Sequence, residues 1–256
     1  MDKDATQTYG LVGRTLGHSF SRAYFTDKFA SEGIDARYVN IELPEITDLP
    51  AALERLPNLK GFNVTIPYKQ DVMVYLDRVA PEAETIGAVN VVRVEPDGTM
   101  TGYNTDVIGF TESIRPLIGP DARRALVLGV GGATRAVVAG LRSLGLVPTT
   151  VSRRAGAGDL TWGEVTPEVI ASHEVIVNCT PLGTWPDVDT APAIPYDALT
   201  PRHVCFDLVY NPAETLFLQR AAERGAATCN GFEMLRLQAD AAWRIWTTQR
   251  AVGRLM

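Results

Sequence analysis

Short apolar runs alternate with helix-like segments along the whole chain, and the pattern changes near residue 105. Before this point, the apolar runs that predict strands are residues 9–12, 38–41, 61–65, 88–94 and 100–103. The turn Glu95-Pro96-Asp97-Gly98 between the last two predicts a hairpin, and residues 21–31 predict a helix. Strand–helix alternation that includes a hairpin predicts an α/β unit with a mixed sheet.

From residue 105 onward, the pattern is typical of a parallel sheet. Residues 125–128 are all apolar, as expected of a strand buried on both faces. Further strands are predicted at 148–151, 174–178 and 203–206, and helices at 105–115, 136–144, 215–224 and 232–246. A buried strand, a glycine turn, a helix and a second strand in this order predict a nucleotide-binding βαβ unit.

Composition and charge exclude several classes of function. The chain has 256 residues, 46% of them hydrophobic, and 24 basic against 30 acidic side chains give a net charge of −6. This balance argues against a general nucleic-acid or anionic-membrane binder, although a small anionic ligand needs only a few local cations. The charged start, Met1-Asp2-Lys3-Asp4, does not resemble a signal peptide, and no apolar run approaches the roughly 20 residues that span a bilayer. We therefore expect a cytoplasmic protein.

The cysteines and histidines give no sign of a disulfide framework or a metal site. They are few, widely separated and without ligand spacing: Cys179, Cys205, Cys229, His18, His173 and His203. We expect the cysteines to be small buried residues and no metal to be bound.

A glycine turn follows the buried strand at 125–128. Gly129, Gly131 and Gly132 would let backbone N–H groups approach a pyrophosphate at the start of the next helix. Thr134 occupies the place of the last glycine in the usual G-x-G-x-x-G pattern. Tight strand–helix packing is the alternative explanation of the glycines, but the flanking strand and helix favour a nucleotide.

The end of the next strand distinguishes between two nucleotides. NAD sites usually place an acidic residue about 20 positions onward to bind the ribose 2′-hydroxyl. Here the chain reads Ser152-Arg153-Arg154, and no acid occurs before Asp159. Arginine suits a 2′-phosphate, so the sequence predicts NADP, against the alternative that both arginines are surface charges.

Polar clusters follow the strand ends and turns of the first half. They are His18-Ser19-Phe20-Ser21, Asn63-Val64-Thr65-Ile66-Pro67-Tyr68-Lys69, Ala88-Val89-Asn90 and Asn104-Thr105-Asp106. Taken singly, Ser21 or Asp106 could be a helix cap and Lys69 a surface lysine. Their arrangement at strand ends indicates a site assembled from several segments.

In this order, the clusters resemble the motifs of the shikimate dehydrogenase family. The resemblance extends over nearly the whole chain, through the glycine turn, Asn178-Cys179-Thr180, Asp207-Leu208-Val209-Tyr210, and Gly231-Phe232-Glu233-Met234-Leu235 with Gln238. It implies reversible, NADPH-dependent reduction of 3-dehydroshikimate to shikimate in aromatic amino-acid biosynthesis. It also implies a small-molecule substrate with no nucleic-acid or membrane partner, no metal, and either a monomer or a homodimer.

The resemblance further implies a role for each residue. Lys69 and Asp106 would form the catalytic pair at the reacting oxygen, which gains negative charge during hydride transfer and needs a proton. The substrate would be bound by Ser19, Ser21, Thr65, Lys69, Asn90, Asp106, Tyr210 and Gln238. The cofactor would be bound by Gly129, Gly131, Gly132, Ala133, Ser152, Arg153, Arg154, Thr180, Leu208 and Gly231.

The implied fold is α/β with two domains around a cleft. A substrate-binding and catalytic domain would span residues 1–104 and a Rossmann-type, parallel-sheet NADP-binding domain residues 105–235. The final helix, about 236–256, would pack back onto the first domain. The chain departs from the family pattern at Arg22, where proline is common, and after Arg154, where a further basic residue is common but Gly156-Ala157-Gly158 follows.

Two alternatives stand beside this interpretation. The first is a relative that acts on quinate, or on both quinate and shikimate, with NAD; quinate-preferring relatives often replace one carboxylate-binding serine by threonine, whereas Ser19 and Ser21 are both serines. The second is a non-catalytic nucleotide-binding relative, which would be expected to lack Lys69 or Asp106.

Overall fold

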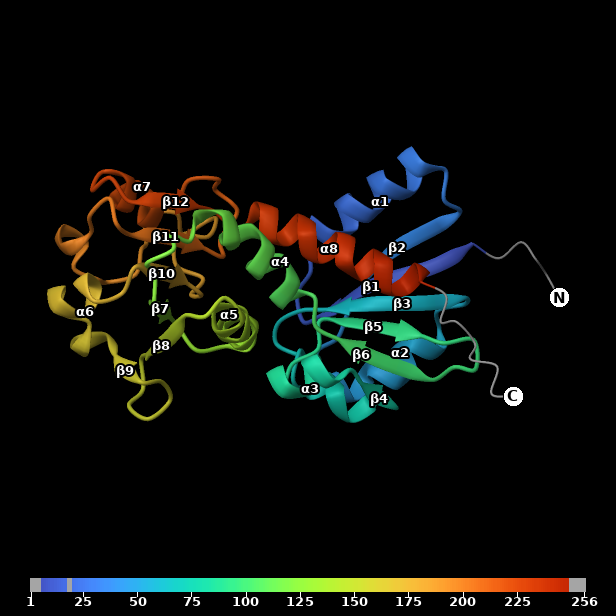
Figure 1. Cartoon of the computed structure of the whole chain (residues 1–256). Helices are drawn as coiled ribbons and strands as arrows, with labels where there is room; N and C mark the ends of the chain where they lie inside the picture. The colour runs from blue at the N-terminus through green and yellow to red at the C-terminus, as the bar shows by residue number, and fades with distance from the viewer. Residues whose placement is uncertain (1–5, 18–19, 249–256) are drawn as a thin grey trace, which may run out of the picture. The chain divides into compact units, whose positions relative to one another are not determined.

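The protein folds into two compact α/β units. The structure is a computed structural model that describes residues 6–17 and 20–248. Unit 1 comprises the described residues up to Thr105 and those from Ala239 onward, and unit 2 is Asp106–Gln238. The chain therefore passes from one unit to the other after Thr105 and after Gln238. Each unit has its own sheet (Figure 1), and the predicted α/β class with one mixed and one parallel sheet is confirmed.

Unit 1 contains a mixed six-stranded sheet. Its strands are β1 (Gln7–Gly13), β2 (Ala36–Glu42), β3 (Leu59–Val64), β4 (Arg78–Val79), β5 (Val91–Val94) and β6 (Met100–Tyr103). The strand order is β2-β1-β3-β5-β6-β4. The pairs β1–β2, β1–β3 and β4–β6 are parallel, whereas β5 runs antiparallel to β3 and β6, as the predicted hairpin requires.

Helices cover both faces of the unit 1 sheet (Figure 1). On one face, α1 (Phe20–Glu32) and the later part of α8 (Phe232–Thr247) bury aromatic residues against β1 and β2. On the other face lie α2 (Leu49–Glu54), α3 (Pro81–Ile86) and the 3-10 helices η1 (Ile46–Asp48) and η2 (Asp71–Tyr75).

Unit 2 contains a six-stranded, entirely parallel sheet. Its strands are β7 (Arg124–Leu128), β8 (Val147–Ser152), β9 (Leu160–Thr161), β10 (Val175–Asn178), β11 (Val204–Asp207) and β12 (Ala227–Cys229). The order β9-β8-β7-β10-β11-β12 is that of a doubly wound dinucleotide-binding fold. The strand order reverses between β7 and β10, where ligands bind in such sheets.

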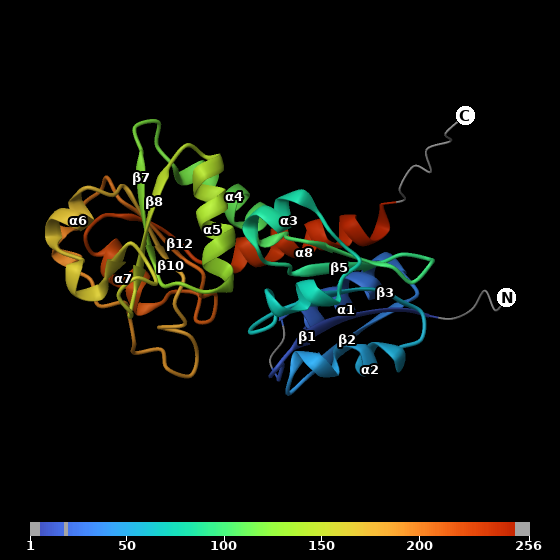
Figure 2. The ribbon, with the colours of Figure 1, turned by 90° about the horizontal axis from the view of Figure 1, so that it is seen from below.

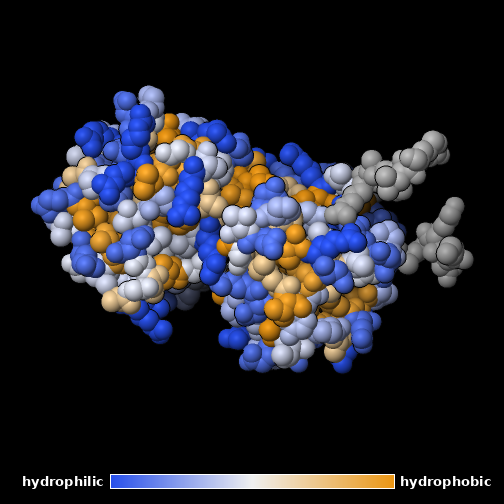
Figure 3. All heavy atoms as spheres, turned by 60° about the horizontal axis from the view of Figure 1, so that its bottom comes forward, coloured by the Kyte–Doolittle hydropathy of each residue, from blue (hydrophilic) through white to orange (hydrophobic). Residues whose placement is uncertain are grey.

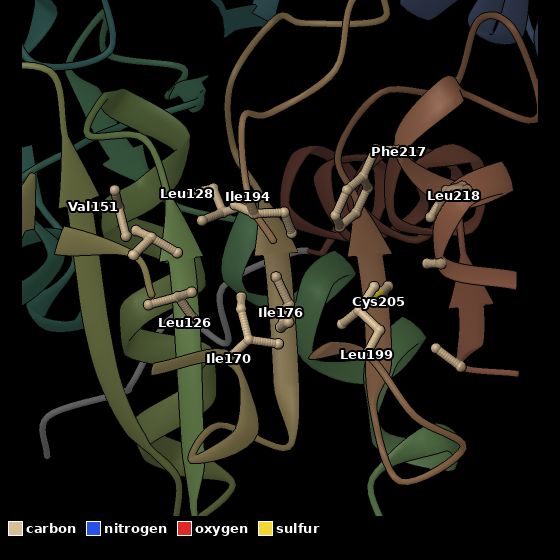
Figure 4. Packing of buried hydrophobic residues seen from close by; sticks show 13 residues of the cluster. Leu126, Leu128, Val151, Ile170, Ile176, Ile194, Leu199, Cys205, Phe217 and Leu218 are labelled. Atoms are coloured by element: carbon tan, nitrogen blue, oxygen red, sulfur yellow. The ribbon is translucent and has the colours of Figure 1, made fainter. Parts of the chain in front are cut away.

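The helices of unit 2 also lie on both faces of their sheet. α4 (Asp106–Ile114), α5 (Gly132–Ser143) and the start of α8 cover one face, with η3 (Arg115–Leu117) after α4. α6 (Pro167–Ala171) and α7 (Leu216–Ala222) cover the other, with η4 (Trp162–Glu164) and η5 (Tyr196–Ala198) near them. Figure 2 shows α5 and α6 on opposite sides of β7 and β8. Figure 4 shows Leu126, Leu128 and Ile176 from the strands facing the same layer as Phe217 and Leu218 of α7.

Three features of the described residues bear on possible ligands and partners. On the face shown in Figure 3, hydrophilic and hydrophobic residues are interspersed over both units. None of the helices among the described residues has the length and hydropathy of a membrane span. Among residues 6–17 and 20–248, no three His, Cys, Asp or Glu side chains are grouped so that they could hold a metal ion.

Candidate active site

Three of the predicted polar residues of unit 1, Thr65, Lys69 and Asn90, lie in segments that meet near the end of β3. Thr65 follows β3 directly, and its backbone N–H donates to the carbonyl of Val12 at the end of β1 (2.9 Å). The turn after Thr65 carries the half-buried Lys69, whose carbonyl accepts the N–H of Val89 at 2.7 Å. The backbone segments that carry Thr65, Lys69 and Asn90 therefore lie against one another.

Asn90 fixes the segment that leads to Asp106. Its side chain is 2% exposed; Oδ1 accepts the Thr105 N–H at 2.7 Å, and Nδ2 donates to Thr105 Oγ1 at 3.1 Å. Asn104 Nδ2 donates to the carbonyl of Ala88 (2.9 Å). Asp106 follows as the buried first residue of α4. The N-terminus of a helix favours negative charge.

A hydrogen-bonded chain links α1 to the same strand end. The Ser21 hydroxyl bonds to the hydroxyl of Tyr38, which donates to Asn63 Oδ1 at 2.7 Å. Asn63 Nδ2 then donates to the carbonyl of Asn90 at 3.3 Å. Burial raises the pKa of Tyr38 well above its ordinary value, so the phenol stays protonated as a donor. Ser19 lies outside the described residues.

In unit 2, the predicted cofactor residues follow the carboxyl ends of neighbouring parallel strands. Gly129 directly follows β7 and has a φ of +107°, and a Cβ there would lie 3.0 Å from Cγ2 of Thr180, which follows β10. Thr134 closes the turn: its hydroxyl accepts the Gly131 N–H at 3.0 Å and donates to the Gly129 carbonyl at 3.2 Å. A hydroxyl thus stabilises the turn at the place of the last glycine of the usual pattern.

Gly131 is not required by the protein's own packing. Its backbone is extended, with φ −165°, and a Cβ there would meet no atom within 4 Å. The open space lies before Gly132 and Ala133, the first residues of α5, where N–H groups and the helix dipole favour an anion. This open cradle fits the pyrophosphate of a dinucleotide.

The end of β8 presents cations and no available acid. Arg153 and Arg154 are exposed, and the buried Ser152 accepts the Arg154 N–H through its hydroxyl (3.1 Å). The Asp159 carboxylate already accepts the N–H and the hydroxyl of Thr150, at 2.7 and 2.8 Å. These bonds lower the pKa of Asp159 and engage the carboxylate that could otherwise bind a ribose diol. The residues therefore fit a 2′-phosphate.

A buried carboxylate organises the ends of β10 and β11. Asp207 accepts hydrogen bonds from Asn178 Nδ2 (3.0 Å), the Val209 N–H (3.0 Å) and Thr215 Oγ1 (2.6 Å). Asn178 Oδ1 in turn accepts the N–H and hydroxyl of Thr180. Burial raises the pKa of Asp207 to about 6, although its donors favour the charged form. The carboxylate thereby shapes the loop of Thr180 and the segment that runs on to Tyr210.

The remaining candidates lie next to these segments or at the end of unit 2. Gly231 donates its N–H to the carbonyl of Val209 (3.1 Å), and a Cβ there would lie 2.2 Å from the Leu208 carbonyl oxygen. Tyr210 is 37% exposed, and partial burial raises its pKa. Gln238 lies in α8, is 7% exposed and donates to the carbonyl of Leu235 at 3.1 Å.

Comparison with known proteins identifies the family. The family model described as the shikimate dehydrogenase substrate binding domain matches residues 11–92. A shikimate dehydrogenase (NADP(+)) of Desulforamulus reducens is 35% identical over 94% of this chain and 90% of its own length. The chain belongs to the shikimate dehydrogenase family.

Solved structures of family members extend the comparison to the fold. Shikimate 5-dehydrogenase from Thermus thermophilus, in complex with NADP(H) and shikimate, is 33% identical, with 94% of this chain and 93% of that chain covered and a TM-score of 0.83. A quinate dehydrogenase from Corynebacterium glutamicum in complex with NAD is 29% identical, with 94% of both chains covered and a TM-score of 0.83. A shikimate dehydrogenase and a quinate dehydrogenase therefore share the fold of this chain.

Sequence reasoning missed two residues that support this site. Tyr38 lies in a short apolar run and has the pattern of an ordinary core residue, and Thr105 stands between two more conspicuous polar residues. Their importance follows from side-chain bonds to Asn63 and Asn90, which are distant in sequence. Arg22, the departure from the family pattern, is exposed.

Proposed function

We propose that this chain is a cytoplasmic shikimate dehydrogenase that catalyses the reversible, NADP-dependent oxidation of shikimate to 3-dehydroshikimate. The proposal rests on one observation above all. The chain matches a family member over 94% of its length, and backbone hydrogen bonds at the end of β3 join the segments that carry Lys69 and Asn90. Bound NADP(H) would supply the hydride chemistry, and the chain's own residues would bind, orient and exchange the proton.

Lys69 and Asp106 are the proposed catalytic pair. The ammonium of Lys69 would stabilise the negative charge that develops on the reacting oxygen and supply its proton. Asp106 would favour the charged form of Lys69 and orient it. The bonds from Asn90 to Thr105 support this role, because they fix the backbone immediately before Asp106.

Substrate binding would use the other polar residues of the family motifs. Ser21, with Ser19 and Tyr210, would bind the carboxylate through hydroxyl groups. Thr65, Asn90, Asp106 and Gln238 would bind ring hydroxyls. Unit 1 would thus carry most of the substrate-binding groups.

Unit 2 would bind NADP(H) at the carboxyl edge of its parallel sheet. The glycine turn would hold the pyrophosphate, and Arg153 and Arg154 the 2′-phosphate. Support comes from the space beside Gly131 and from the engagement of Asp159 by Thr150. Ala133, Ser152, Thr180, Leu208 and Gly231 would complete the cofactor site.

Oxidation of quinate with NAD is the second candidate, because a quinate dehydrogenase in complex with NAD has the same TM-score to this chain as the shikimate complex. Absorbance at 340 nm with shikimate or quinate, each with NADP⁺ or NAD⁺, separates the two. We expect rapid reduction with shikimate and NADP⁺. Turnover only with quinate or only with NAD⁺ would overturn the specificity, and no turnover in all four assays would overturn the enzyme function.

Replacement of Lys69 tests the catalytic assignment. Lys69→Met keeps most of the length of the side chain but removes its charge and proton, and we expect kcat to fall by at least about 100-fold. Lys60→Met on β3 is the matched control, with kcat close to wild type. A folded Lys69→Met variant with near-normal kcat would show that another group handles the proton.

A further inference from the structure

A glycine lies in the interior of the helix that begins with Asp106. Gly109 is one turn after Asp106 in the nine-residue α4, and Gly109 is buried. Glycine is less favourable than alanine in a helix interior, and Gly109 has no positive φ that would require it. The reason for glycine at this position must therefore be sought in its neighbours.

The neighbour is α8, the helix that carries Gln238. A Cβ on Gly109 would lie 2.4 Å from the carbonyl oxygen of Met234, 3.0 Å from Cβ of Gln238 and 3.1 Å from its backbone N. Figures 1 and 2 both show α4 beside the first turns of α8. Two of these three atoms are backbone atoms, so they cannot move aside unless α8 itself moves.

The opposite side of α4 is closely packed as well. A Cβ on Gly140 of α5 would lie 2.7 Å from Thr111 Oγ1 and 2.8 Å from Cδ1 of Phe110. Phe110 is fully buried in the core between α4, α5 and the sheet. α4 therefore cannot retreat toward α5 to make room for a side chain at position 109, and the displacement would fall on α8 and Gln238.

We propose that Gly109 is a positioning residue for the substrate, because it sets the close spacing of α4 and α8 and hence of Asp106 and Gln238. The inference rests on the proposed function, in which these two side chains bind hydroxyl groups of the same small ring. Such a ring tolerates little error in the spacing of its partners. Gly109 acts through Gln238 and touches no reactant itself.

Gly109→Ala tests this role, with Gly119→Ala as the matched control because a Cβ at Gly119 would meet no atom within 4 Å. We expect Gly109→Ala to raise KM for shikimate about tenfold. The Kd for NADP⁺ should change by less than about twofold, because the cofactor residues follow other strand ends. Gly119→Ala should change neither constant. A purely structural role for Gly109 would lower the melting temperature and leave both constants of the folded enzyme unchanged.

A double-mutant cycle tests the route through Gln238. In a Gln238→Ala background, Gly109→Ala should change kcat/KM by less than about twofold, since the displaced group is already absent. A full tenfold effect in that background would overturn the inference, as would an unchanged KM for the single variant. A wild type that does not oxidise shikimate would instead overturn the proposed function, which separates the two failures.

Gly140→Ala decides the question if Gly109→Ala does not fold. The nearest atoms to a Cβ at position 140 belong to side chains of α4, so this variant is easier to accommodate than Gly109→Ala. The added methyl group still pushes α4 toward α8. We expect a smaller rise in KM for shikimate that again disappears in the Gln238→Ala background. No rise in KM in a folded Gly140→Ala variant would overturn the inference.

Discussion

Two glycines of the turn after β7 are present for different reasons. Gly129 has a φ of +107°, which L side chains rarely adopt, and it lies close to Thr180. Gly131 is extended and faces open space. Substitution of Gly129 would strain the fold itself, whereas substitution of Gly131 would fill only the space that we assign to the pyrophosphate.

Gly131→Ala should therefore separate binding from stability. We expect the melting temperature to stay within about 2 °C of wild type and the Kd for NADP⁺ to rise at least about tenfold, because the methyl group occupies the cradle. Thermal unfolding and fluorescence titration measure the two quantities, with Gly119→Ala as the control. Unchanged NADP⁺ affinity would place the pyrophosphate elsewhere.

At the residue scale, the sequence predicts those side chains that stand in compact motifs. Gly129, Gly131 and Arg153 could be named as candidates because the chemistry of a nucleotide site requires their residue types at those places. Tyr38 could not be found, because its hydroxyl acquires a role only when the fold brings β2 close to Ser21 of α1 and Asn63 of β3. Such supporting bonds depend on tertiary structure and leave no local pattern.

The segment between β8 and β9 is short and serves the adenine end of the proposed cofactor site. Residues 153–159 contain no helix and turn at Gly156, which has a φ of +79°. The turn is closed by the Ala157 N–H, which donates to the carbonyl of Arg154 at 3.2 Å. The segment thereby holds Arg153 and Arg154 at the end of β8, and Asp159 returns to bond with Thr150 of the same strand.

Replacement of both arginines should change cofactor preference. In Arg153→Ala/Arg154→Ala, we expect KM for NADP⁺ to rise at least about tenfold and KM for NAD⁺ to change little, because only the 2′-phosphate loses its partners. Asp159→Asn is the control and should leave the ratio of the two constants unchanged. Equal rises for both cofactors would exclude these arginines as the 2′-phosphate site.

α6 is a five-residue helix that depends on tertiary contacts, and His173 supplies one of them. His173 Nδ1 donates to the carbonyl of Val169 (2.7 Å), and Nε2 accepts from the hydroxyl of Thr149 (3.0 Å). Burial lowers the pKa of His173. A short helix of this kind has little intrinsic stability, so its tie to β8 matters.

The lowered pKa of His173 makes stability depend on pH. Below about pH 6.5, the unfolded chain binds more protons at this group than the folded protein does, so the free energy of unfolding falls as the pH is lowered. Asp207, with its pKa raised to about 6, gives the opposite slope between about pH 4 and pH 6. We therefore compare urea unfolding of wild type with His173→Gln. The difference between them should shrink as pH falls, and a difference independent of pH would contradict the assignment.

At the element scale, length and burial decide what the sequence predicts. The buried runs of β1, β7, β10 and β11 predict strands correctly because they are continuous and apolar. β12, with residues Ala227–Cys229, is a short, largely exposed edge strand that exists through its pairing with β11. The predicted strand at 88–94 begins only at Val91, because the N–H of Ala88 donates to the carbonyl of Ala83 and that of Val89 to the carbonyl of Lys69.

At the scale of the whole molecule, unit 1 is discontinuous in sequence. Ala239, Ala242 and Trp246 of α8 belong to its core with Tyr9 and Phe25. The indole N–H of Trp246 donates to the carbonyl of Val92 at 2.9 Å across Gly61, where a Cβ would lie 2.3 Å from the indole nitrogen.

A second contact holds the end of α8 to unit 1. Arg93 Nη1 donates to the carbonyls of Ile245 and Thr248 at 3.3 and 3.2 Å. The sequence could indicate that the last segment is a long helix, but the complementarity of Gly61 and Trp246 is a property of the assembled core.

This discontinuity predicts how fragments behave. Residues 106–238 form one continuous piece with its own sheet and core, so we expect the isolated fragment to unfold cooperatively and to bind NADP⁺. Residues 1–105 lack α8, and the loss of Trp246 alone should remove about 3–5 kcal/mol from the stability of a small domain. We expect this fragment not to unfold cooperatively in urea by circular dichroism until a peptide of residues 232–248 is added. Cooperative unfolding of residues 1–105 alone would mean that the sheet and its other helices suffice, and that α8 is bound by a core already formed.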